Sequence, residues 1–322
     1  MSESENHHPR IQSQFEVPLD AGGSRIDVIC AEIWTDFSRA RLSQWISAGA
    51  IRIDGQQVKP KYKVLGGELV TVDAQPESQV TWVGQPLDLQ TLFVDEHLII
   101  VNKPAGLVVH PGHGNPSHTL VNALLHHYPE LDTIPRAGIV HRLDKDTSGV
   151  LAIARSPKAH QKLIAQLKDR SMGRQYWALV FGKTRPVGTI DAPMDRHRIQ
   201  RTRMAVMTQG KPAVTHYRTL QQTAHVSAIE VRLETGRTHQ IRVHMTHLGH
   251  PLVGDPVYKA GRPGFGTMLA PVRARVDAFP RQALHAESLR LIHPATGEPM
   301  SFTAPLADDL VALMHDLQRD DH

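Results

Sequence analysis

Apolar residues in the first quarter of the chain change from helical to strand-like spacing. They recur at helical intervals before Gly49, with Ser38 placed to cap the second helix, and then alternate with polar residues around the Asp54-Gly55 turn. The predicted helices span 25–34 and 38–48, and the predicted strands span 51–53 and 68–72. This pattern predicts a module of two short helices on a small hairpin sheet.

The rest of the chain alternates many strand-like runs with few helical ones. Strands are predicted at 98–102, 150–154, 176–181, 228–233 and 240–244. Helices are predicted at 157–170, after the capping residue Ser156, and at 305–319. Strands in series with helices on the flank favour an α+β fold over a doubly wound parallel sheet. We predict a disordered tail at 1–14, a small domain at 15–80, a linker at 81–88 and a larger domain at 89–322.

Composition sets the broad class of protein. The 322 residues are 40% apolar and 21% charged, which is enough for two packed cores. The single cysteine, Cys30, excludes an internal disulfide framework and any zinc site made of several thiolates. The first residues lack the apolar core of a secretory signal, and charged residues interrupt the apolar run at 92–101. We therefore expect a cytoplasmic protein that is neither exported nor membrane-spanning.

Positive charge is concentrated in two windows, although the net charge is only +4. The first basic window, 39–63, contains a single acidic residue and six basic ones: Arg39, Arg41, Arg52, Lys59, Lys61 and Lys63. The second basic window, 194–218, also contains a single acidic residue and six basic ones: Arg196, Arg198, Arg201, Arg203, Lys211 and Arg218. Basic faces of this kind bind nucleic-acid backbones, but a solvated surface is the competing interpretation.

Several common chemistries lack their motifs. The chain has no glycine-rich dinucleotide fingerprint, no phosphate-cradling loop and no hydrolase elbow around a serine. Four histidines crowd residues 239–250, but their spacing matches no standard zinc pattern. We expect no metal site.

Residues 138–149 are the densest polar segment and precede an apolar strand. The run His-Arg-Leu-Asp-Lys-Asp-Thr-Ser at 141–148 suits a functional loop at a sheet edge, or a turn whose polar groups only cap the backbone. Local composition does not separate these two interpretations.

Residues 141–149 resemble the signature loop of the RluA-type RNA pseudouridine synthases. Further segments resemble motifs of that family in the same order, at 103–111, 174–182, 233–244, 254–258 and 282–286. Residues 25–75 resemble the S4 RNA-binding module that many of these enzymes carry. Agreement at 109–112, 135–142 and 210–217 is closest to the branch that acts on large-subunit (23S) ribosomal RNA.

This resemblance implies an α+β catalytic domain with a mixed, largely antiparallel sheet. It implies an isomerase that flips a uridine out of the RNA and converts it to pseudouridine without a cofactor. Asp144 would be the catalytic carboxylate, as nucleophile or as base, and Asp146 is a less favoured second candidate. Arg242 would pair with Asp144, and strand alternation over 240–244 would point it into the cleft. Tyr176 would stack on the base and relay a proton, and Arg142 would fill the space that the base leaves.

The resemblance also assigns the basic windows to RNA. The expected partner is large-subunit ribosomal RNA, free or in a pre-ribosomal 50S particle, bound by a monomer. The RNA-contacting residues would be Arg39, Arg41, Arg52, Lys59, Lys61, Arg196, Arg198, Arg201, Arg203 and Lys211. Two alternatives remain: an RNA-binding assembly factor without activity, and a glycosylase or hydrolase that uses Asp144 and Asp146 as paired carboxylates.

Overall fold

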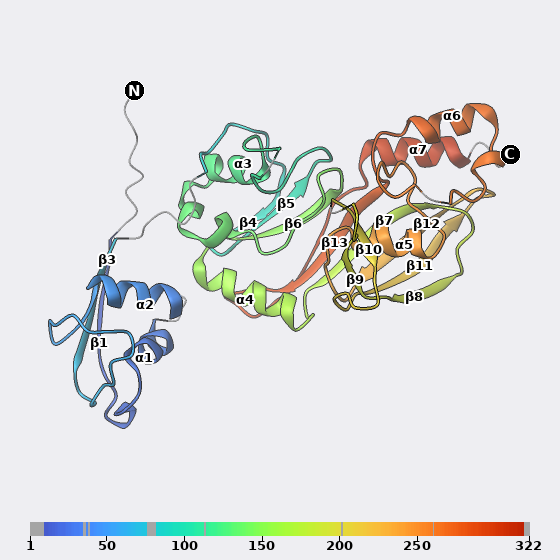
Figure 1. Cartoon of the computed structure of the whole chain (residues 1–322). Helices are drawn as coiled ribbons and strands as arrows, with labels where there is room; N and C mark the ends of the chain where they lie inside the picture. Colours follow the sequence, from blue (N-terminus) through green and yellow to red (C-terminus); the bar gives the residue numbers. More distant parts are fainter. Residues whose placement is uncertain are drawn as a thin grey trace.

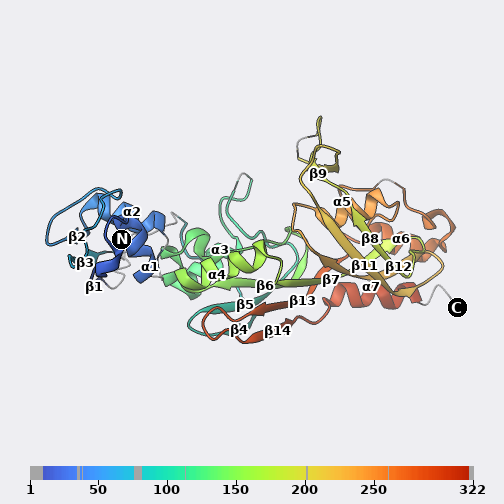
Figure 2. The same ribbon diagram turned by 90° about the horizontal axis from the view of Figure 1, so that it is seen from below.

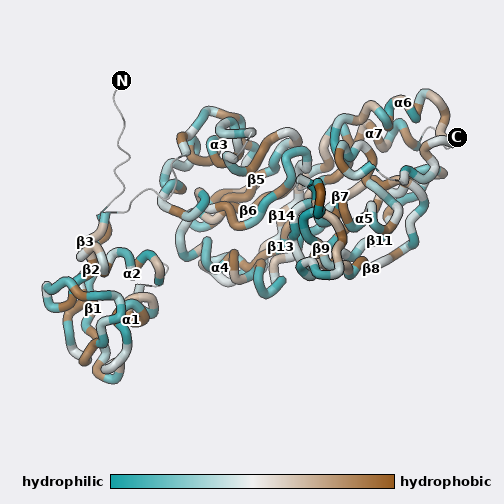
Figure 3. Tube along the Cα trace, viewed as in Figure 1, coloured by the Kyte–Doolittle hydropathy of each residue, from teal (hydrophilic) through white to brown (hydrophobic). Residues whose placement is uncertain are grey.

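The computed structural model describes residues 10–34, 37, 39–75, 82–112, 114–200, 202–259 and 261–318. It contains an amino-terminal module and a larger module built on one long sheet (Figure 1). Hydrophobic residues concentrate along the central strands of each module (Figure 3). Over these ranges, no helix is both long and apolar enough to span a lipid bilayer.

The amino-terminal module is the predicted pair of helices on a small sheet. Its elements are β1 (Ile11–Glu16), a 3₁₀ turn (Leu19–Ala21), α1 (Ile26–Ile33), α2 (Arg39–Ala48), β2 (Ile51–Ile53) and β3 (Leu69–Ala74). The sheet order is β1-β3-β2, and both pairs are antiparallel. Ile26, Leu42 and Ile46 of the helices are fully buried against it. The predicted cap, Ser38, lies outside the described residues.

Strand β1 corrects the predicted tail at 1–14. Residues 11–14 pair with β3, and the Phe15 ring packs edge-on against Trp34, with centroids 5.0 Å apart. The segment is polar at most positions because this edge strand buries only one side, so its sequence lacks the apolar run that signals a strand. Residues 1–9 lie outside the described residues.

The larger module contains a nine-stranded mixed sheet. Its strands are β4 (Thr91–Val94), β5 (Leu98–Lys103), β6 (Ser148–Ala154), β7 (Gly173–Phe181), β8 (Val187–Asp191), β11 (Val214–Gln222), β12 (Val226–Leu233), β13 (Leu284–Ile292) and β14 (Pro299–Thr303). The order is β4-β5-β6-β13-β7-β12-β11-β8, with β14 beside β13. The β6–β13 pair is parallel and the other pairs are antiparallel. The predicted α+β class and mixed, largely antiparallel sheet are confirmed.

Helices cover both faces of this sheet. They are α3 (Leu120–His127), α4 (Pro157–Lys168), α5 (Gln240–His247), α6 (Ala270–Ala278) and α7 (Asp308–Gln318), with 3₁₀ turns at Pro129–Thr133, Pro135–Gly138 and Phe265–Thr267. Along β7, Tyr176 and Ala178 join the core that includes α3 and α5, whereas Trp177 and Leu179 join the core that includes α6 and α7. The Ser156 hydroxyl caps α4 by accepting from the Ala159 N–H, as predicted.

Residues 240–247 form helix α5, so the predicted strand at 240–244 is wrong. The alternation of Ile241 and Val243 suggested a strand, but a five-residue window cannot separate the two periods. In the fold, Ile241 and Met245, one helical turn apart, pack into the main core, while Val243 packs elsewhere. Long-range burial therefore decides in favour of the helix.

Two further strands form a hairpin that stands apart from the sheet. β9 (Met194–Arg196) pairs antiparallel with β10 (Met204–Val206), and Figure 2 shows this projecting hairpin, of which residues 194–200 and 202–206 are described, extending from the larger module. Its described residues include Arg196, Arg198 and Arg203 of the second basic window.

The predicted linker contains no helix or strand over its described residues, 82–88. The side-chain amide of Asn122, in α3, donates to the Val83 carbonyl oxygen, and the backbone carbonyl oxygen of Asn122 accepts from the Gln85 N–H. These two bonds hold the linker along α3. A Cβ on Gly84 would lie 2.8 Å from the backbone nitrogen of His126, so this contact requires glycine.

Candidate active site

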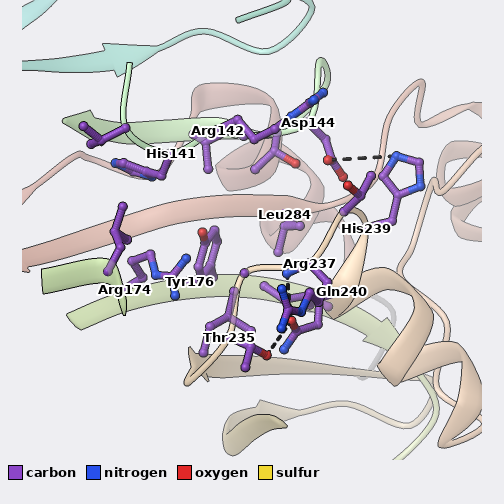
Figure 4. Close-up of a pocket in the computed structure, with 18 of the residues that line it drawn as sticks. His141, Arg142, Asp144, Arg174, Tyr176, Thr235, Arg237, His239, Gln240 and Leu284 are labelled. Atoms are coloured by element: carbon purple, nitrogen blue, oxygen red, sulfur yellow. Dashed lines mark hydrogen bonds and ion pairs between the residues drawn. The ribbon is translucent and has the colours of Figure 1, made fainter. Parts of the chain in front are cut away.

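One cavity of about 540 Å³ opens in the larger module. The segment 139–147, which we call the Asp144 loop, forms one wall, and β7, residues 233–239 and the start of α5 form the other (Figure 4). The predicted residues Arg142, Asp144, Tyr176 and Arg242 all line it. The structure thus brings together side chains that are far apart in the sequence.

The Asp144 loop is fixed at both ends by glycines with left-handed backbone. At Gly138 (φ 78°) a Cβ would lie 2.0 Å from the Ala154 carbonyl oxygen, and at Gly149 (φ 113°) it would lie 2.1 Å from that of Ala286. Neither contact tolerates a side chain. These close approaches seat the loop directly against the sheet.

Lys103, at the end of β5, is hydrogen-bonded to the same loop. Its side chain is fully buried, and Nζ donates to the carbonyl oxygens of Pro104 at 2.7 Å, Leu107 at 2.9 Å and Lys145 at 2.9 Å. Burial lowers the pKa of this ammonium to about 7, although Asp146 and Asp144 act in the opposite direction. The bond to Lys145 ties the residue after Asp144 to β5.

Asp144 is paired with Arg242, as the resemblance implied. Arg242 Nη1 lies 3.1 Å from Asp144 Oδ2, and the Asp144 side chain is 18% exposed to the cavity. Arg242 reaches it from α5 rather than from a strand, so the predicted contact is present but the predicted geometry behind it is wrong. A buried cation thus fixes one oxygen of a carboxylate that faces open space.

Asp255 holds Arg242 from the other side. Its carboxylate accepts from Arg242 Nε at 2.7 Å and from Nη2 at 2.9 Å, and it also accepts from the backbone N–H groups of Val257 and Tyr258. Burial opposes the charge of Arg242, but the hydrogen bonds to Asp255 and Asp144 outweigh it and raise the guanidinium pKa above its ordinary value. In the sequence, Asp255 belongs to the 254–258 motif, but nothing there indicated its role.

His239 lies on the open side of Asp144. Its Nε2 is 4.0 Å from Asp144 Oδ1, and its Nδ1 is 2.8 Å from the hydroxyl of Tyr258. Burial lowers the pKa of His239, while Asp144 partly restores it. In the sequence this histidine stands out only as one of the crowded set at 239–250.

Tyr176 projects from β7 into the cavity (Figure 4). The residue is 6% exposed. Burial raises the pKa of its phenol, Arg174 lowers it and Asp144 raises it, with a net upward shift. At neutral pH the hydroxyl is therefore protonated, and the ring offers a flat apolar wall close to the carboxylate.

Arg142 lies two residues before Asp144 and Asp146 two residues after it, but only Arg142 lines the cavity. Arg142 is exposed and lines the cavity. Asp146 is not among the lining residues, and its backbone carbonyl accepts from Arg281 Nη1 at 3.1 Å. The geometry therefore favours Asp144 over Asp146 as the reactive carboxylate.

The predicted RNA-contacting residues fall on two separate surfaces. On the amino-terminal module, Lys59, Lys61 and Lys63 are exposed. Arg39 pairs with the buried carboxylate of Asp27, Arg52 donates to the Gly49 carbonyl oxygen, and the Arg41 guanidinium lies over the Trp45 ring at 5.7 Å.

The second surface is the projecting hairpin and its base. Arg196, Arg198 and Lys211 are exposed and Arg203 is half-buried, while Arg201 lies outside the described residues. Arg218 is different, because it is on β11 and pairs with Glu230 at 2.7 Å. The hairpin and its base thus expose positive charge at Arg196, Arg198 and Lys211.

The crowded histidines have separate partners. His244 is buried and hydrogen-bonds to the Thr215 hydroxyl and the Ala192 carbonyl oxygen, and His250 bonds to the Phe181 carbonyl oxygen. Across the described ranges there is no group of three or more His, Cys, Asp or Glu side chains arranged to hold a metal ion.

Comparison with known families matches both modules. The RNA pseudouridylate synthase model matches residues 97–247, and the S4 domain model matches residues 24–70. A Pseudomonas aeruginosa protein named ribosomal large subunit pseudouridine synthase D is 47% identical over 315 residues, which cover 96% of this chain and 97% of that protein. The protein of the same name from Escherichia coli strain K12 is 46% identical over 313 residues, covering 97% of this chain and 96% of that protein.

Solved structures share the fold of the larger module. Human RNA pseudouridylate synthase domain containing 4 has a TM-score of 0.56 at 25% identity, over 71% of this chain and 93% of that one. Human RNA pseudouridylate synthase domain containing 1 has a TM-score of 0.54 at 26% identity, over 74% of this chain and 98% of that one. Since relatives nearly half identical span almost the whole sequence, this chain belongs to the family of RNA pseudouridylate synthases and carries an S4 domain near its amino terminus.

Proposed function

We propose that this protein converts specific uridines of large-subunit (23S) ribosomal RNA to pseudouridine, with Asp144 as the catalytic carboxylate. The observation that carries the proposal is the Asp144–Arg242 ion pair at 3.1 Å, on the wall of a cavity that Tyr176 also lines. The substrate class follows from the names of relatives that match the chain over nearly its full length.

The reaction breaks the bond between uracil N1 and ribose C1′, turns the base and joins C5 to the same carbon. The proton on C5 is lost, N1 gains one, and the mass of the RNA does not change. An anionic carboxylate beside C1′ assists either by forming a bond to the sugar or by removing a proton from it. Arg242 serves both routes, because it keeps Asp144 oriented toward the cavity.

Tyr176 and Arg142 handle the base. The buried Tyr176 ring stacks on the flipped uracil, and its phenol oxygen takes up the C5 proton at the end of the reaction while its own hydrogen passes to water in the cavity. The exposed Arg142 enters the space in the RNA that the base has left. Extrusion of a paired base costs a few kcal/mol, and these contacts offset that cost.

RNA is held on the S4 domain and on the projecting hairpin. Residues 11–80 act as the S4 module, which takes in β1 ahead of the predicted start at 15, while 81–88 act as the linker and 89–322 as the catalytic domain. The contacts are made by ten of the twelve basic residues of the two windows: Arg39, Arg41, Arg52, Lys59, Lys61, Arg196, Arg198, Arg201, Arg203 and Lys211. The protein works as a cytoplasmic monomer on free ribosomal RNA or on a pre-ribosomal 50S particle.

The test is release of tritium from ribosomal RNA labelled at C5 of uridine. We expect release by the wild type and none by Asp144→Asn. Asp146→Asn is the matched control, because Asp146 does not line the cavity, and it should retain most of the activity. Turnover by Asp144→Asn would refute the assignment of the carboxylate.

The two alternatives give different products. An inactive assembly factor binds RNA and releases no tritium. A glycosylase or hydrolase releases uracil and lowers the mass of the RNA, whereas isomerisation leaves that mass unchanged.

A further inference from the structure

A short chain of polar contacts connects the projecting hairpin with the Asp144 carboxylate, and Tyr258 is at its centre. The Tyr258 hydroxyl accepts from the backbone N–H of Met204, the first residue of β10, over 2.9 Å. The same hydroxyl is 2.8 Å from His239 Nδ1. His239 Nε2 in turn lies 4.0 Å from Asp144 Oδ1.

These two bonds suit the tautomer of His239 that accepts on Nδ1 and carries its hydrogen on Nε2. A tyrosine hydroxyl has one hydrogen, and since it accepts from Met204 it is free to donate that hydrogen to His239 Nδ1. His239 then carries its own proton on Nε2, the nitrogen that faces Asp144. The imidazole thus directs an N–H toward Oδ1, the oxygen opposite the one that Arg242 binds.

Apolar packing runs along the same path. The Tyr258 ring packs with Met194 and Met204 of the hairpin and with Val243 of α5. The Arg242 guanidinium carbon lies 5.0 Å from the centre of that ring. Tyr258 therefore contacts the hairpin, the helix that carries Arg242, and His239.

The backbone of His239 shows that its position is imposed by its surroundings. It has φ 57° and ψ 20°, a left-handed conformation that costs a residue other than glycine about 1–2 kcal/mol. The bond to Tyr258 is one of the contacts that offset this cost.

We propose that Tyr258 and His239 are positioning residues that couple RNA contact at the projecting hairpin to the arrangement of charges around Asp144. This inference rests on the proposed function, since the ligand of the hairpin is the RNA substrate. Phosphates bound by Arg196 and Arg198 fix the hairpin and with it the Met204 N–H. Tyr258 then holds His239 so that its Nε2–H closes from 4.0 Å to hydrogen-bonding distance of Asp144.

Tyr258→Phe removes the hydroxyl and keeps the ring beside Arg242. We would measure the dissociation constant of a 23S ribosomal RNA fragment and the single-turnover rate at saturating enzyme. We expect the rate to fall about three- to tenfold, the effect of one or two hydrogen bonds, while the dissociation constant changes less than about twofold. Tyr217→Phe is the control, because Tyr217 is a buried tyrosine of β11 outside this chain of contacts, and it should change neither quantity.

The coupling itself is tested with the hairpin. Replacing Arg196 and Arg198 together by alanine should weaken RNA binding and lower the saturated rate in the wild-type background. In the Tyr258→Phe background the same replacement should weaken binding and leave the already reduced rate unchanged. Independent, multiplying losses of rate would overturn the proposal.

His239→Asn provides a second variant in case Tyr258→Phe fails to fold. Asparagine tolerates left-handed backbone but is too short to reach Asp144 as the imidazole does. It should show the same loss of rate with intact RNA binding, and a wild-type rate would overturn the proposal. If the wild type itself releases no tritium, the proposed function fails; if the wild type is active and both variants match it, only the coupling fails.

Discussion

Asp255 is the buried carboxylate that holds Arg242 beside Asp144, and the Asp255→Asn variant keeps its shape while removing its charge. The Asp255 carboxylate accepts from Arg242 Nε and Nη2 and from two backbone N–H groups. An asparagine places an NH₂ group where one of these oxygens was, so a donor then faces a donor. The variant therefore leaves Arg242 with an incomplete set of partners.

The size of the effect follows from burial. The side chains of Asp255 and Arg242 are 1% and 5% exposed, so water screens their attraction little. Removing one partner of a buried ion pair costs about 3–5 kcal/mol, because the remaining charge is uncompensated. Asp144 still contacts Arg242 at 3.1 Å, so we expect the lower end, about 3 kcal/mol of the free energy of unfolding. Arg242 also loses the contacts that fix its orientation, and with it that of Asp144, so we expect the single-turnover rate to fall at least about tenfold.

Urea titration gives the free energy of unfolding, and tritium release gives the rate. Asp277→Asn is the control, because Asp277 pairs with Arg262 on the surface and its replacement should have no measurable effect. The double variant Arg242→Met, Asp255→Asn should cost less stability than the two single variants together, since it removes both buried charges and leaves only the cavity-facing Asp144 without its partner. A destabilisation below about 1 kcal/mol for Asp255→Asn, with an unchanged rate, would refute this account of the charge balance.

Three other predictions test the loop, its pH dependence and the S4 surface. Burial lowers the pKa of His141 to about 3, below the value of about 6.5 in an unfolded chain, so the unfolded state binds a proton that the folded state excludes. Stability should therefore fall as the pH drops from about 6.5 toward 3, by at most about 2 kcal/mol at pH 5; an equal decline in His141→Asn, measured by urea titration, would contradict this. Gly138→Ala should cost at least about 2 kcal/mol more stability than Gly106→Ala, because both glycines have φ near 80° but only the Gly138 Cβ would meet a carbonyl oxygen, at 2.0 Å. Replacing Lys59, Lys61 and Lys63 together by alanine should weaken RNA binding and flatten its salt dependence by about 0.7–0.9 in log–log slope for each phosphate that the variant no longer neutralises, and an unchanged slope would exclude this face from RNA binding.

Local features of the fold could be predicted from the sequence because they depend on neighbouring residues. Ser156 and Pro157 mark the start of α4, and alternation along β7 places Tyr176 and Trp177 on opposite faces. The motif around Asp144 was likewise visible as a dense polar run before an apolar strand. Each of these signals is read within about ten residues of chain.

The arrangement of the site was decided by interactions that no local pattern encodes. Arg242 meets Asp144 from 98 residues away, and it does so from a helix although five residues of alternation favoured a strand. The sheet order, with β13 between β6 and β7, brings the carboxyl-terminal part of the chain into the middle of the fold.

No role could be predicted for Asp255 and Tyr258 from the sequence. A short Gly-Asp-Pro turn has the same local pattern whether or not its aspartate binds a buried arginine. The sequence by itself determined most of the elements and the family, and it singled out Asp144 as the candidate carboxylate. Only the tertiary structure decided which buried charges and hydroxyls surround that carboxylate, because long-range packing determines which polar side chains are buried next to one another.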